Sequence, residues 1–565
     1  MNVLFCALHF SYYRNFESVV RALAARGHRV HLAADEPETM GGAELVERLA
    51  AELPGVTWGF TPRLDEWTWM PLSRAVRRGL EFVRFLDPRY ERIVKYRART
   101  RERAASGLVR LLGGGRGRSA AWRGRVARVL AAIERGIPTP PVMDAFIAER
   151  APDVVLLASV TNPGALQLDH QKSAMAAGRR CALTIFSWDH LSGKAWLKLF
   201  PERVIVWNDI QKAEATDLHG IPPDRVVVTG AQCYDQWFDR HPSRSREQFC
   251  DSIGLDPSKP ILLYVCSVLS RPAPAEAPFV LDWIRALRES DDPVLRQAGV
   301  LIRPHPERLR EWNGLDLASW PNVALSGRNP VDAQAKADYF DSLYYASAVV
   351  GLVTSAFVEA AVVGRPTLTI ETSAFTVHQE GTTHFGYLAD PATGVLLTAP
   401  DFDTHVRQLS DVLAHPGAAA ARTRAFVERF VRPHGLERRA TDRFVETVES
   451  LGEAPAPDAV VFGAGRGRLV AGALCVLAAQ PGIRTLFLSE TEIADERQRA
   501  AHEADGLRIK AERRTARQEH LQSLRLAKQA RQAQEADVKM RRRAERELAK
   551  AAKRRATDER RRVQS

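Results

Sequence analysis

The sequence predicts an α/β protein with two domains that face each other across a cleft, followed by a basic helical tail. Three observations lead to this prediction. Short apolar runs alternate with helix-like segments over residues 1–240, and the same alternation begins again after residue 256. Residues 491–565 then change to a composition rich in Ala, Arg, Glu and Gln, with no Pro and one Gly. Strands that alternate with helices are typical of parallel sheets covered by helices.

The first domain, residues 1–240, begins with a continuous apolar run at 3–8 that suits a buried parallel strand. A helical pattern follows at 16–25, and Gly27 stands where a glycine commonly ends a helix. Further strands are expected at residues 30–33, 154–158, 181–186 and 204–207. A long insertion at about 64–135, rich in Arg and Trp, interrupts this series and is expected to be helical.

The second domain, residues 241–450, repeats the pattern. Its strands are expected at residues 261–266, 300–302, 323–325, 349–353 and 367–370, and a helical pattern continues to about residue 450. Ligands of open parallel sheets bind beyond the carboxyl ends of the strands. Two such domains therefore predict a cleft with a donor on one side and an acceptor on the other. Residues 451–490 read as a linker and a small apolar segment whose role stays open.

Charge is concentrated in the tail. The chain carries a net charge of +12, and residues 491–565 hold 22 Lys or Arg against 13 Asp or Glu, which leaves the rest nearly neutral. The high isoelectric point is therefore weak support for nucleic-acid binding, and no specific nucleic-acid partner is expected. Leu and Ile are too sparse in the tail for a long coiled-coil seam, so a solvated helix or a partly disordered segment is expected.

The cysteines and the N-terminus indicate the compartment. The six cysteines form no CxxC pair, which favours a reducing compartment and neither a disulfide framework nor a zinc site. The first 16 residues lack a basic segment before their short apolar run, so they read as a first strand rather than as a signal peptide. No apolar stretch reaches the roughly 18 residues of a spanning helix. A cytoplasmic protein is expected.

The strongest chemical motif is IRPHPE at residues 302–307. It follows an apolar strand, so His305 should lie at the cleft, and the prolines on either side hold it in a rigid loop. An imidazole beside Arg303 suits a pyrophosphate or a leaving phosphate, where negative charge develops during group transfer. The alternative is a histidine that only caps a turn.

A second motif occupies residues 351–360. A strand ends near residue 353, and Thr354 and Ser355 are natural residues for the start of the next helix. Their hydroxyls and the free helix N–H groups make an anion site, although plain helix capping explains them as well. Glu359 lies one helical turn beyond Ser355 and could accept hydrogen bonds from ribose hydroxyls, or simply be solvated.

These motifs, together with Gly-Arg-Pro at 364–366, resemble those of GT-B glycosyltransferases, which are built from two Rossmann-like domains. The resemblance is to the group of CDP-glycerol glycerophosphotransferases, bacterial polysialyltransferases and capsule polysaccharide transferases. In that group the HP histidine and the Ser/Thr pair contact the phosphates of a cytidine nucleotide donor. The resemblance thus implies these roles for His305, Thr354 and Ser355. The opening of the first domain, a strand followed by Arg-Asn-Phe at 14–16 and a helix, also resembles many GT-B families.

On the acceptor side, Asp189 follows a strand in the segment 186–194, which resembles uncharacterised bacterial proteins placed among such transferases. A carboxylate there could take the proton from an acceptor hydroxyl. His190 and His9, which also follow strands, are rival bases, and a loop-stabilising hydrogen bond is the alternative for each. Gly230 follows another strand, where it allows either close approach to a ligand or a tight turn.

The loop at 372–386 contains His378, Glu380 and His384 and could line the donor pocket. Its spacing is not a known metal-ligand pattern, and no DxD pair follows a strand, so no metal or cofactor is expected. Arg-rich helices at 74–128 interleave with aromatic residues and could dock on an anionic membrane surface, or be solvated.

The expected function is a metal-independent glycosyltransferase or glycerophosphotransferase. It would move a group from a nucleotide-activated donor to a cell-surface glycan or a lipid-linked acceptor, in the cytoplasm or peripherally at the inner face of the cell membrane. Two alternatives stay open. One is a nucleotide-sugar 2-epimerase, although the sequence lacks the arginine- and glutamate-rich donor loop of that family. The other is a non-catalytic scaffold in polysaccharide assembly.

Overall fold

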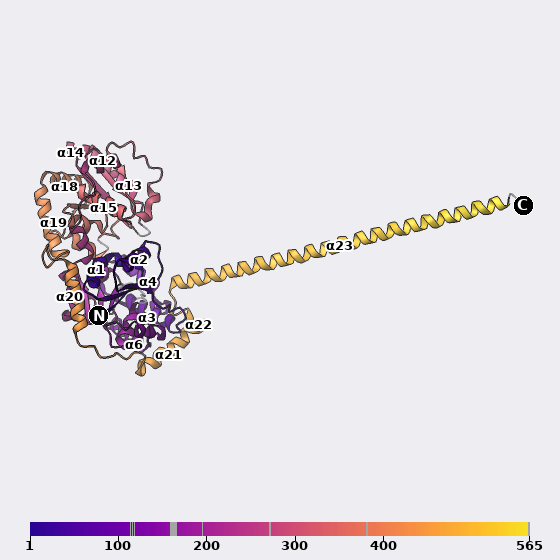
Figure 1. The fold of residues 1–565 in the computed structure, drawn as a ribbon, viewed down its shortest axis with the longest axis horizontal. Coiled ribbons are helices and arrows are strands. Elements are labelled where there is room, and N and C mark those ends of the chain that lie inside the picture. Colours follow the sequence, from indigo (N-terminus) through magenta and orange to yellow (C-terminus); the bar gives the residue numbers. More distant parts are fainter. Residues whose placement is uncertain are drawn as a thin grey trace. The chain divides into compact units, whose positions relative to one another are not determined.

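The computed structural model describes residues 1–562 apart from 114, 116, 118, 159–166, 195, 270–272, 331 and 380–381. The chain forms two compact units, Met1–Glu490 and Thr491–Ser565. The first unit contains both sheets of the protein, and the second is the C-terminal part of a single long helix (Figure 1).

A seven-stranded parallel sheet forms the first domain, in the order β3-β2-β1-β4-β5-β6-β7. Every side chain of β4 and nearly every one of β1 is buried, as expected of strands that are covered on both faces. In the central register, Phe5 of β1 lies opposite Leu32 on one side and Leu156 on the other. The strands are β1 (Asn2–Ala7), β2 (Arg29–Ala34), β3 (Val56–Phe60), β4 (Val154–Ala158), β5 (Arg180–Thr184), β6 (Arg203–Val206) and β7 (Val226–Val228).

Helices cover both faces of this sheet. On one face, α1 (Glu17–Ala25) and α2 (Gly42–Glu52) share an apolar cluster with β1 and β2, and on the other face α7 (Pro141–Arg150) packs against β4 and β5. The remaining helices of this domain outside the insertion are α8 (Gln167–Ala176), α9 (His190–Gly193), α10 (Asp209–Ala213) and α11 (Asp235–Phe238).

The second domain is a six-stranded parallel sheet in the order β10-β9-β8-β11-β12-β13. In both sheets the first strand of the chain lies in the interior. The next two strands are added toward one edge, and the later strands are added on the other side of the first strand, which is the doubly wound order of Rossmann-like domains. Two such domains confirm the predicted GT-B fold class. The strands are β8 (Ile261–Val265), β9 (Gly299–Arg303), β10 (Val323–Leu325), β11 (Ala348–Val350), β12 (Thr367–Ile370) and β13 (Leu396–Ala399).

The helices of the second domain lie between and beyond these strands. They are α12 (Arg246–Ile253), α13 (Glu276–Glu289), α14 (Pro293–Gln297), α15 (Ala333–Tyr345), α16 (Ala356–Val362), α17 (Thr383–Ala389), α18 (Phe402–Ala414) and α19 (Pro416–Phe430). No further strand was expected in the helical pattern between residue 370 and about 450, and β13 corrects that expectation.

The last helix of this series, α20 (Ala440–Glu453), packs on the first sheet rather than on the second. Its residues Phe444, Val445, Val448 and Leu451 are buried in the same cluster as Phe5 and Leu156. The chain therefore crosses from the first domain to the second near residue 240 and returns near residue 435. Residues 440–450, which the predicted range 241–450 includes, complete the core of the first domain.

The insertion after β3 forms α3 (Met70–Phe85), α4 (Val94–Arg103), α5 (Ser106–Leu111) and α6 (Ala120–Gly136). A buried ion network ties it to the sheet domain, because Arg77 of α3 bonds Asp169 of α8 at 2.6 Å and Glu134 of α6 at 2.9 Å. Buried charges of this kind are tolerated only when they are paired.

The apolar segment after the linker forms α21 (Gly465–Ala479) and the short α22 (Pro481–Arg484), and α21 packs on α3 and α6. Gly136 of α6 and Gly467 of α21 meet at the crossing, where a Cβ added to Gly136 would lie 2.2 Å from the Gly467 carbonyl oxygen. Two glycines thus allow the two backbones to touch.

The tail is a single helix, α23 (Glu490–Arg562), of 73 residues. At 1.5 Å per residue it is about 110 Å long. Nearly all of its described side chains are exposed, in keeping with a sequence that offers no apolar stripe. Among the helices formed by the described residues, none has both the length and the apolar character needed to cross a membrane.

Candidate functional site

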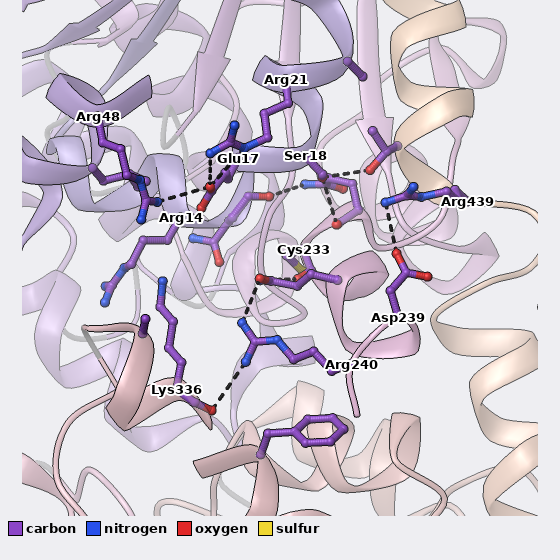
Figure 2. Close-up of a pocket in the computed structure, with 18 of the residues that line it drawn as sticks. Arg14, Glu17, Ser18, Arg21, Arg48, Cys233, Asp239, Arg240, Lys336 and Arg439 are labelled. Carbon is purple, nitrogen blue, oxygen red and sulfur yellow. Dashed lines mark hydrogen bonds and ion pairs between the residues drawn. The ribbon is translucent and has the colours of Figure 1, made fainter. Parts of the chain in front are cut away.

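A cavity of about 1200 Å³ lies between the two domains (Figure 2). One wall is formed by α1, the residues just before it and part of α2. The opposite wall is formed by the start of α15, and the chain segments 232–241 and 439–442 close the side. Residues from both domains therefore meet around one space, as the facing of two Rossmann-like domains predicts.

Some of the charged side chains in this cavity neutralise one another. Glu17, at the start of α1, accepts from Arg21 at 2.9 Å and from Arg48 at 3.2 Å. Arg439 pairs with Asp239 at 3.3 Å. Figure 2 shows both groups at the wall of the cavity, each with its charge already satisfied.

Three other cations of the cavity have no carboxylate partner among the described residues. Arg14 donates through Nε to the Ser11 carbonyl oxygen. Arg240 donates to the side chain of Gln236 and to the backbone carbonyl oxygen of Lys336. The Nζ atom of Lys336 makes no hydrogen bond or ion pair to a described residue. Arg14 and Lys336 point toward the same space from opposite walls (Figure 2).

The electrostatics of this trio reflect their crowding. Burial lowers the pKa of the Lys336 ammonium, and although Glu17 opposes this shift, the nearby cations Arg240, Arg48 and Arg14 lower the pKa further. Burial also lowers the pKa of both Arg14 and Arg240. Cations held together against their own repulsion and partly removed from water form a strong site for a polyanion.

A second, smaller cavity of about 350 Å³ adjoins the first. The cations that line both cavities are the unpaired trio, Arg14, Arg240 and Lys336. The smaller cavity is otherwise rich in aromatic side chains, namely Phe186, Trp188, Trp207, Tyr234, Trp237 and Tyr339. A charged junction thus connects an aromatic chamber to a larger and more polar one.

Ser355 and Glu359 line the smaller cavity. The Tyr339 hydroxyl donates to Glu359 Oε2, and burial raises the pKa of the Glu359 carboxyl although this hydrogen bond and Arg240 favour the charged form. A carboxyl group that is held in place by a phenol and faces a cavity can accept hydrogen bonds from a ligand hydroxyl. Thr354 does not line either cavity, and its Oγ1 accepts from the Ala356 N–H at 3.2 Å as a helix cap.

Neither Arg303 nor His305 of the HP loop lines either cavity, although Arg303 lies over the ring of Tyr339, which lines the smaller one. His305 is half-buried, its Nδ1 accepts from the Glu307 N–H at 3.3 Å, and burial lowers the pKa of its ring. Arg303 is buried and fully engaged, because it donates to Asp338 at 2.9 Å and to the Ser342 hydroxyl at 2.8 Å. In this structure His305 caps a turn, and Arg303 ties β9 to α15.

Asp189 lies beside the smaller cavity, next to the lining residues Ser187 and Trp188. Burial alone would raise the pKa of its carboxyl, but Lys194 at 3.6 Å, His190, His384 and the Ser187 hydroxyl together hold that pKa well below its usual range. A carboxylate whose pKa is so depressed keeps its charge but is a weak proton acceptor.

His190 and His384 flank Asp189 from the two domains. Burial lowers the pKa of His190 to about 4, so this ring is neutral at pH 7, and its buried Nδ1 has no hydrogen-bond partner among the residues that the structure describes. His384, on α17, packs edge-on against Trp188 with ring centroids 4.7 Å apart. Of the three residues expected in the loop at 372–386, His384 lies on α17 and reaches this cluster, and Glu380 lies outside the described residues.

The other two predicted residues lie elsewhere. The ring of His9 lies against Tyr12, outside both cavities, and its Nδ1 is 3.4 Å from the Glu36 carbonyl oxygen. Gly230 has φ +95°, and a Cβ there would lie 2.8 Å from the Cβ of Ala440. The close approach that Gly230 permits is therefore to the first residue of α20.

The cationic trio was not selected from the sequence, although Arg14 belongs to the Arg-Asn-Phe signature after the first strand. Arg240 and Lys336 stand in no motif, so only the tertiary fold reveals them. Within the described part of the chain, no group of three or more His, Cys, Asp or Glu side chains is arranged to hold a metal ion.

Comparison with known proteins gave matches among solved structures alone. No protein-family model matches the chain, and no curated protein does. The match to a glycosyltransferase from Rickettsia africae includes 80% of this chain and 99% of that protein, with 9% sequence identity and a TM-score of 0.45. The match to the UDP-GlcNAc 2-epimerase of Methanocaldococcus jannaschii includes 80% of this chain and 100% of that protein, with 13% identity and a TM-score of 0.45. Two structures of the wall teichoic acid polymerase TagF match 80% of this chain over 88–89% of their own length, with 9–10% identity and TM-scores of 0.39–0.43. The fold class is established independently of these similarities by the strand orders of the two sheets.

Proposed function

We propose that the protein is a transferase that moves a sugar or a glycerol phosphate from a nucleoside-diphosphate donor to a hydroxyl group of a glycan or lipid-linked acceptor. The observation that carries this proposal is the unpaired trio Arg14, Arg240 and Lys336 at the junction of the two cavities. Three cations without carboxylate partners match the charge of a diphosphate.

The shapes of the two cavities fit the two ends of such a reaction. The aromatic chamber offers flat apolar surfaces for a nucleoside, with Glu359 and Ser355 placed to bond its ribose hydroxyls. The larger cavity leaves space for the transferred group and the acceptor. The acceptor oxygen forms a bond to the transferred group as the bond to the leaving phosphate breaks, and the trio stabilises the charge that collects on that phosphate.

The proton of the acceptor hydroxyl requires a base. We assign it to His190, which is neutral at pH 7, because the charged Asp189 beside it favours the imidazolium that forms when the ring takes the proton. The donor is a substrate and no further cofactor is proposed. A lipid-linked acceptor would place the protein in the cytoplasm at the inner face of the cell membrane.

The test is the thermal stability of the full chain with CMP, CDP, UDP, GDP or dTDP. A nucleotide at 100 times its Kd stabilises the folded state by about 2.7 kcal/mol, which is a readable rise in Tm. We expect one diphosphate to stabilise the wild type and to have little effect on Lys336→Ala. Arg439→Ala is the matched control, because Arg439 lines the same cavity but is paired with Asp239.

His305→Ala separates this proposal from a phosphate site at the HP loop. Loss of nucleotide binding in His305→Ala with retention in Lys336→Ala would move the phosphate site to the HP loop. Stabilisation of wild type by none of the nucleotides would favour a non-catalytic scaffold. Conversion of a UDP-sugar without any acceptor would indicate a 2-epimerase.

A further inference from the structure

The segment at 459–489 exposes an unusual number of large apolar side chains. Leu469 is 75% exposed, Val476 63% and Val470 51%, and all three lie on α21. Leu477 of α21 is also exposed, and Val461, Ile483 and Leu486 are exposed on either side of the helix. Scattered exposed apolar residues are ordinary, but a contiguous group of this kind marks an interaction surface.

This surface is the outer side of a helix whose inner side is already packed. Ala471, Leu474 and Cys475 of α21 join the cluster formed by α3 and α6, so Leu469, Val470 and Val476 are left facing away from it. Figure 1 shows α21 next to α6 at the edge of the first unit. At 15 residues the helix is about 22 Å long, too short to span a hydrocarbon core of about 30 Å. It is suited to lie along a surface.

The segment that carries this face is basic. Residues 459–489 contain no Asp or Glu, but they contain Arg466 and Arg484, and also Arg468, whose guanidinium lies over the Trp69 ring. The neighbouring helix α6 continues the pattern, because residues 103–133 also lack Asp and Glu, and Trp122, Arg125 and Arg128 are exposed.

We propose that the outer face of α21 docks on an anionic lipid surface, with its apolar side chains in the boundary of the acyl chains and the arginines at the lipid phosphates. Helices that bind membranes in this way combine an apolar face with basic flanks. This surface is larger than the basic helices expected at 74–128 to dock on a membrane. Its apolar side chains belong to the segment 451–490, for which no role was predicted.

The positive charge of this face disfavours two other binding partners, a second copy of the chain and the tail. A second copy of the chain would bring arginine-rich faces together. The tail carries a net charge of +9 over 491–565 and offers no apolar stripe. An anionic bilayer complements both the charge and the apolar character of the face.

The test is co-sedimentation of the full chain with vesicles of phosphatidylcholine alone or with about one third phosphatidylglycerol, a content that gives a strongly anionic surface. The variant is Leu469→Ser, Val470→Ser and Val476→Ser combined. Its matched control replaces three exposed apolar residues elsewhere, Val142, Val294 and Leu309, with Ser. We expect the wild type and the control to bind the anionic vesicles and the α21 variant to bind about tenfold more weakly or worse.

Repeating the co-sedimentation at increasing salt concentration distinguishes binding through the outer face of α21 from binding through the tail. At about 1 M salt the Debye length falls to 3 Å, so binding through tail charges alone is lost, whereas binding that inserts α21 persists in part. Equal binding of the α21 variant and the wild type would overturn the proposal, as would a wild type that binds neither vesicle. A wild-type dimer that the variant dissociates would also overturn it and make the face a contact between copies. Vesicle binding needs neither donor nor acceptor, so this result is independent of the proposed reaction.

Discussion

At the scale of single residues, burial keeps a proton on the carboxyl group of Glu276 at a pH where an exposed glutamate is charged. Glu276 is only 1% exposed, and burial raises the pKa of its carboxyl to about 7 although it accepts from the Ser267 N–H at 2.8 Å and from the Tyr264 hydroxyl at 3.1 Å. An unfolded glutamate has a pKa near 4.3. Between these two values the folded chain holds a proton that the unfolded chain has lost.

The contribution of Glu276 to stability should therefore fall as the pH rises from about 4.5 to 7, because its folded form binds the proton more tightly than its unfolded form in this range. We expect the free energy of unfolding of Glu276→Gln to decrease by about 3 kcal/mol less than that of the wild type over this pH range, because an amide does not titrate. Urea unfolding at pH 5, 6 and 7.5 measures the effect. Glu289→Gln, in the exposed part of the same helix, is the control and should follow the wild type. Equal pH dependence in both variants would contradict the prediction.

Sequence reasoning reached only part of the site at this scale. Ser355 and Glu359 follow a predicted strand and do line a cavity, because helix starts after parallel strands face the cleft. Arg240 and Lys336 follow no strand and belong to no motif, and they meet Arg14 only when two domains face each other. A motif such as HPE predicts a rigid loop well, but not whether its side chain turns toward the cleft.

At the scale of elements, the strands with continuous apolar runs were predictable, including the edge strands β7 and β10, whereas the edge strands β3 and β13 were not. β1 after Asn2 and all of β8 are buried on both faces, so these side chains are apolar and the pattern is plain. β3 and β13 lie at sheet edges, and their side chains are partly exposed and mixed in polarity. An edge strand has less need for an unbroken apolar run, so neither was predicted.

The glycine contact between α6 and α21 gives a test at this scale. Gly136→Ala should force the helices apart, because the new Cβ would lie 2.2 Å from the Gly467 carbonyl oxygen. We expect destabilisation by about 1–3 kcal/mol, as for other overpacked contacts, and faster tryptic cleavage at Arg466 and Arg468. Gly124→Ala in the same helix is the control, because nothing lies within 4 Å of the added atom. If both variants resist trypsin like the wild type, close contact at Gly136 does not hold α21 in place.

At the scale of the whole molecule, the tail and the body are separate units. The helix α23 has no buried apolar stripe, so its helicity depends on local propensity and should melt gradually. We expect truncation after Glu490 to leave the Tm of the body unchanged and to remove the gradual loss of ellipticity at 222 nm below that transition. Truncation after Pro457 also removes α21 and should lower the Tm, because Ala471 is fully buried against α3 and α6. A lower Tm after the shorter truncation would show that the tail supports the body.

The architecture of the two sheets was predictable because the sequence of each domain shows the repeated alternation of apolar strand-like runs and helix-like segments. The return of α20 was not, because its apolar stripe fits any sheet surface. Only the assembled structure places it on the first sheet, where Asp235 binds the returning chain through Arg432 at 2.8 Å and the Thr441 N–H at 2.7 Å.

The return of α20 also fixes the order in which the protein can be completed during synthesis on the ribosome. Phe444, Val448 and Leu451 belong to the core around Phe5, yet they leave the exit tunnel only after the entire second sheet has been made. Nascent domains usually fold in the order of their synthesis, and here the first cannot close until the second has emerged. An incomplete chain that ends before residue 440 therefore presents an open apolar groove, which is the surface that chaperones hold.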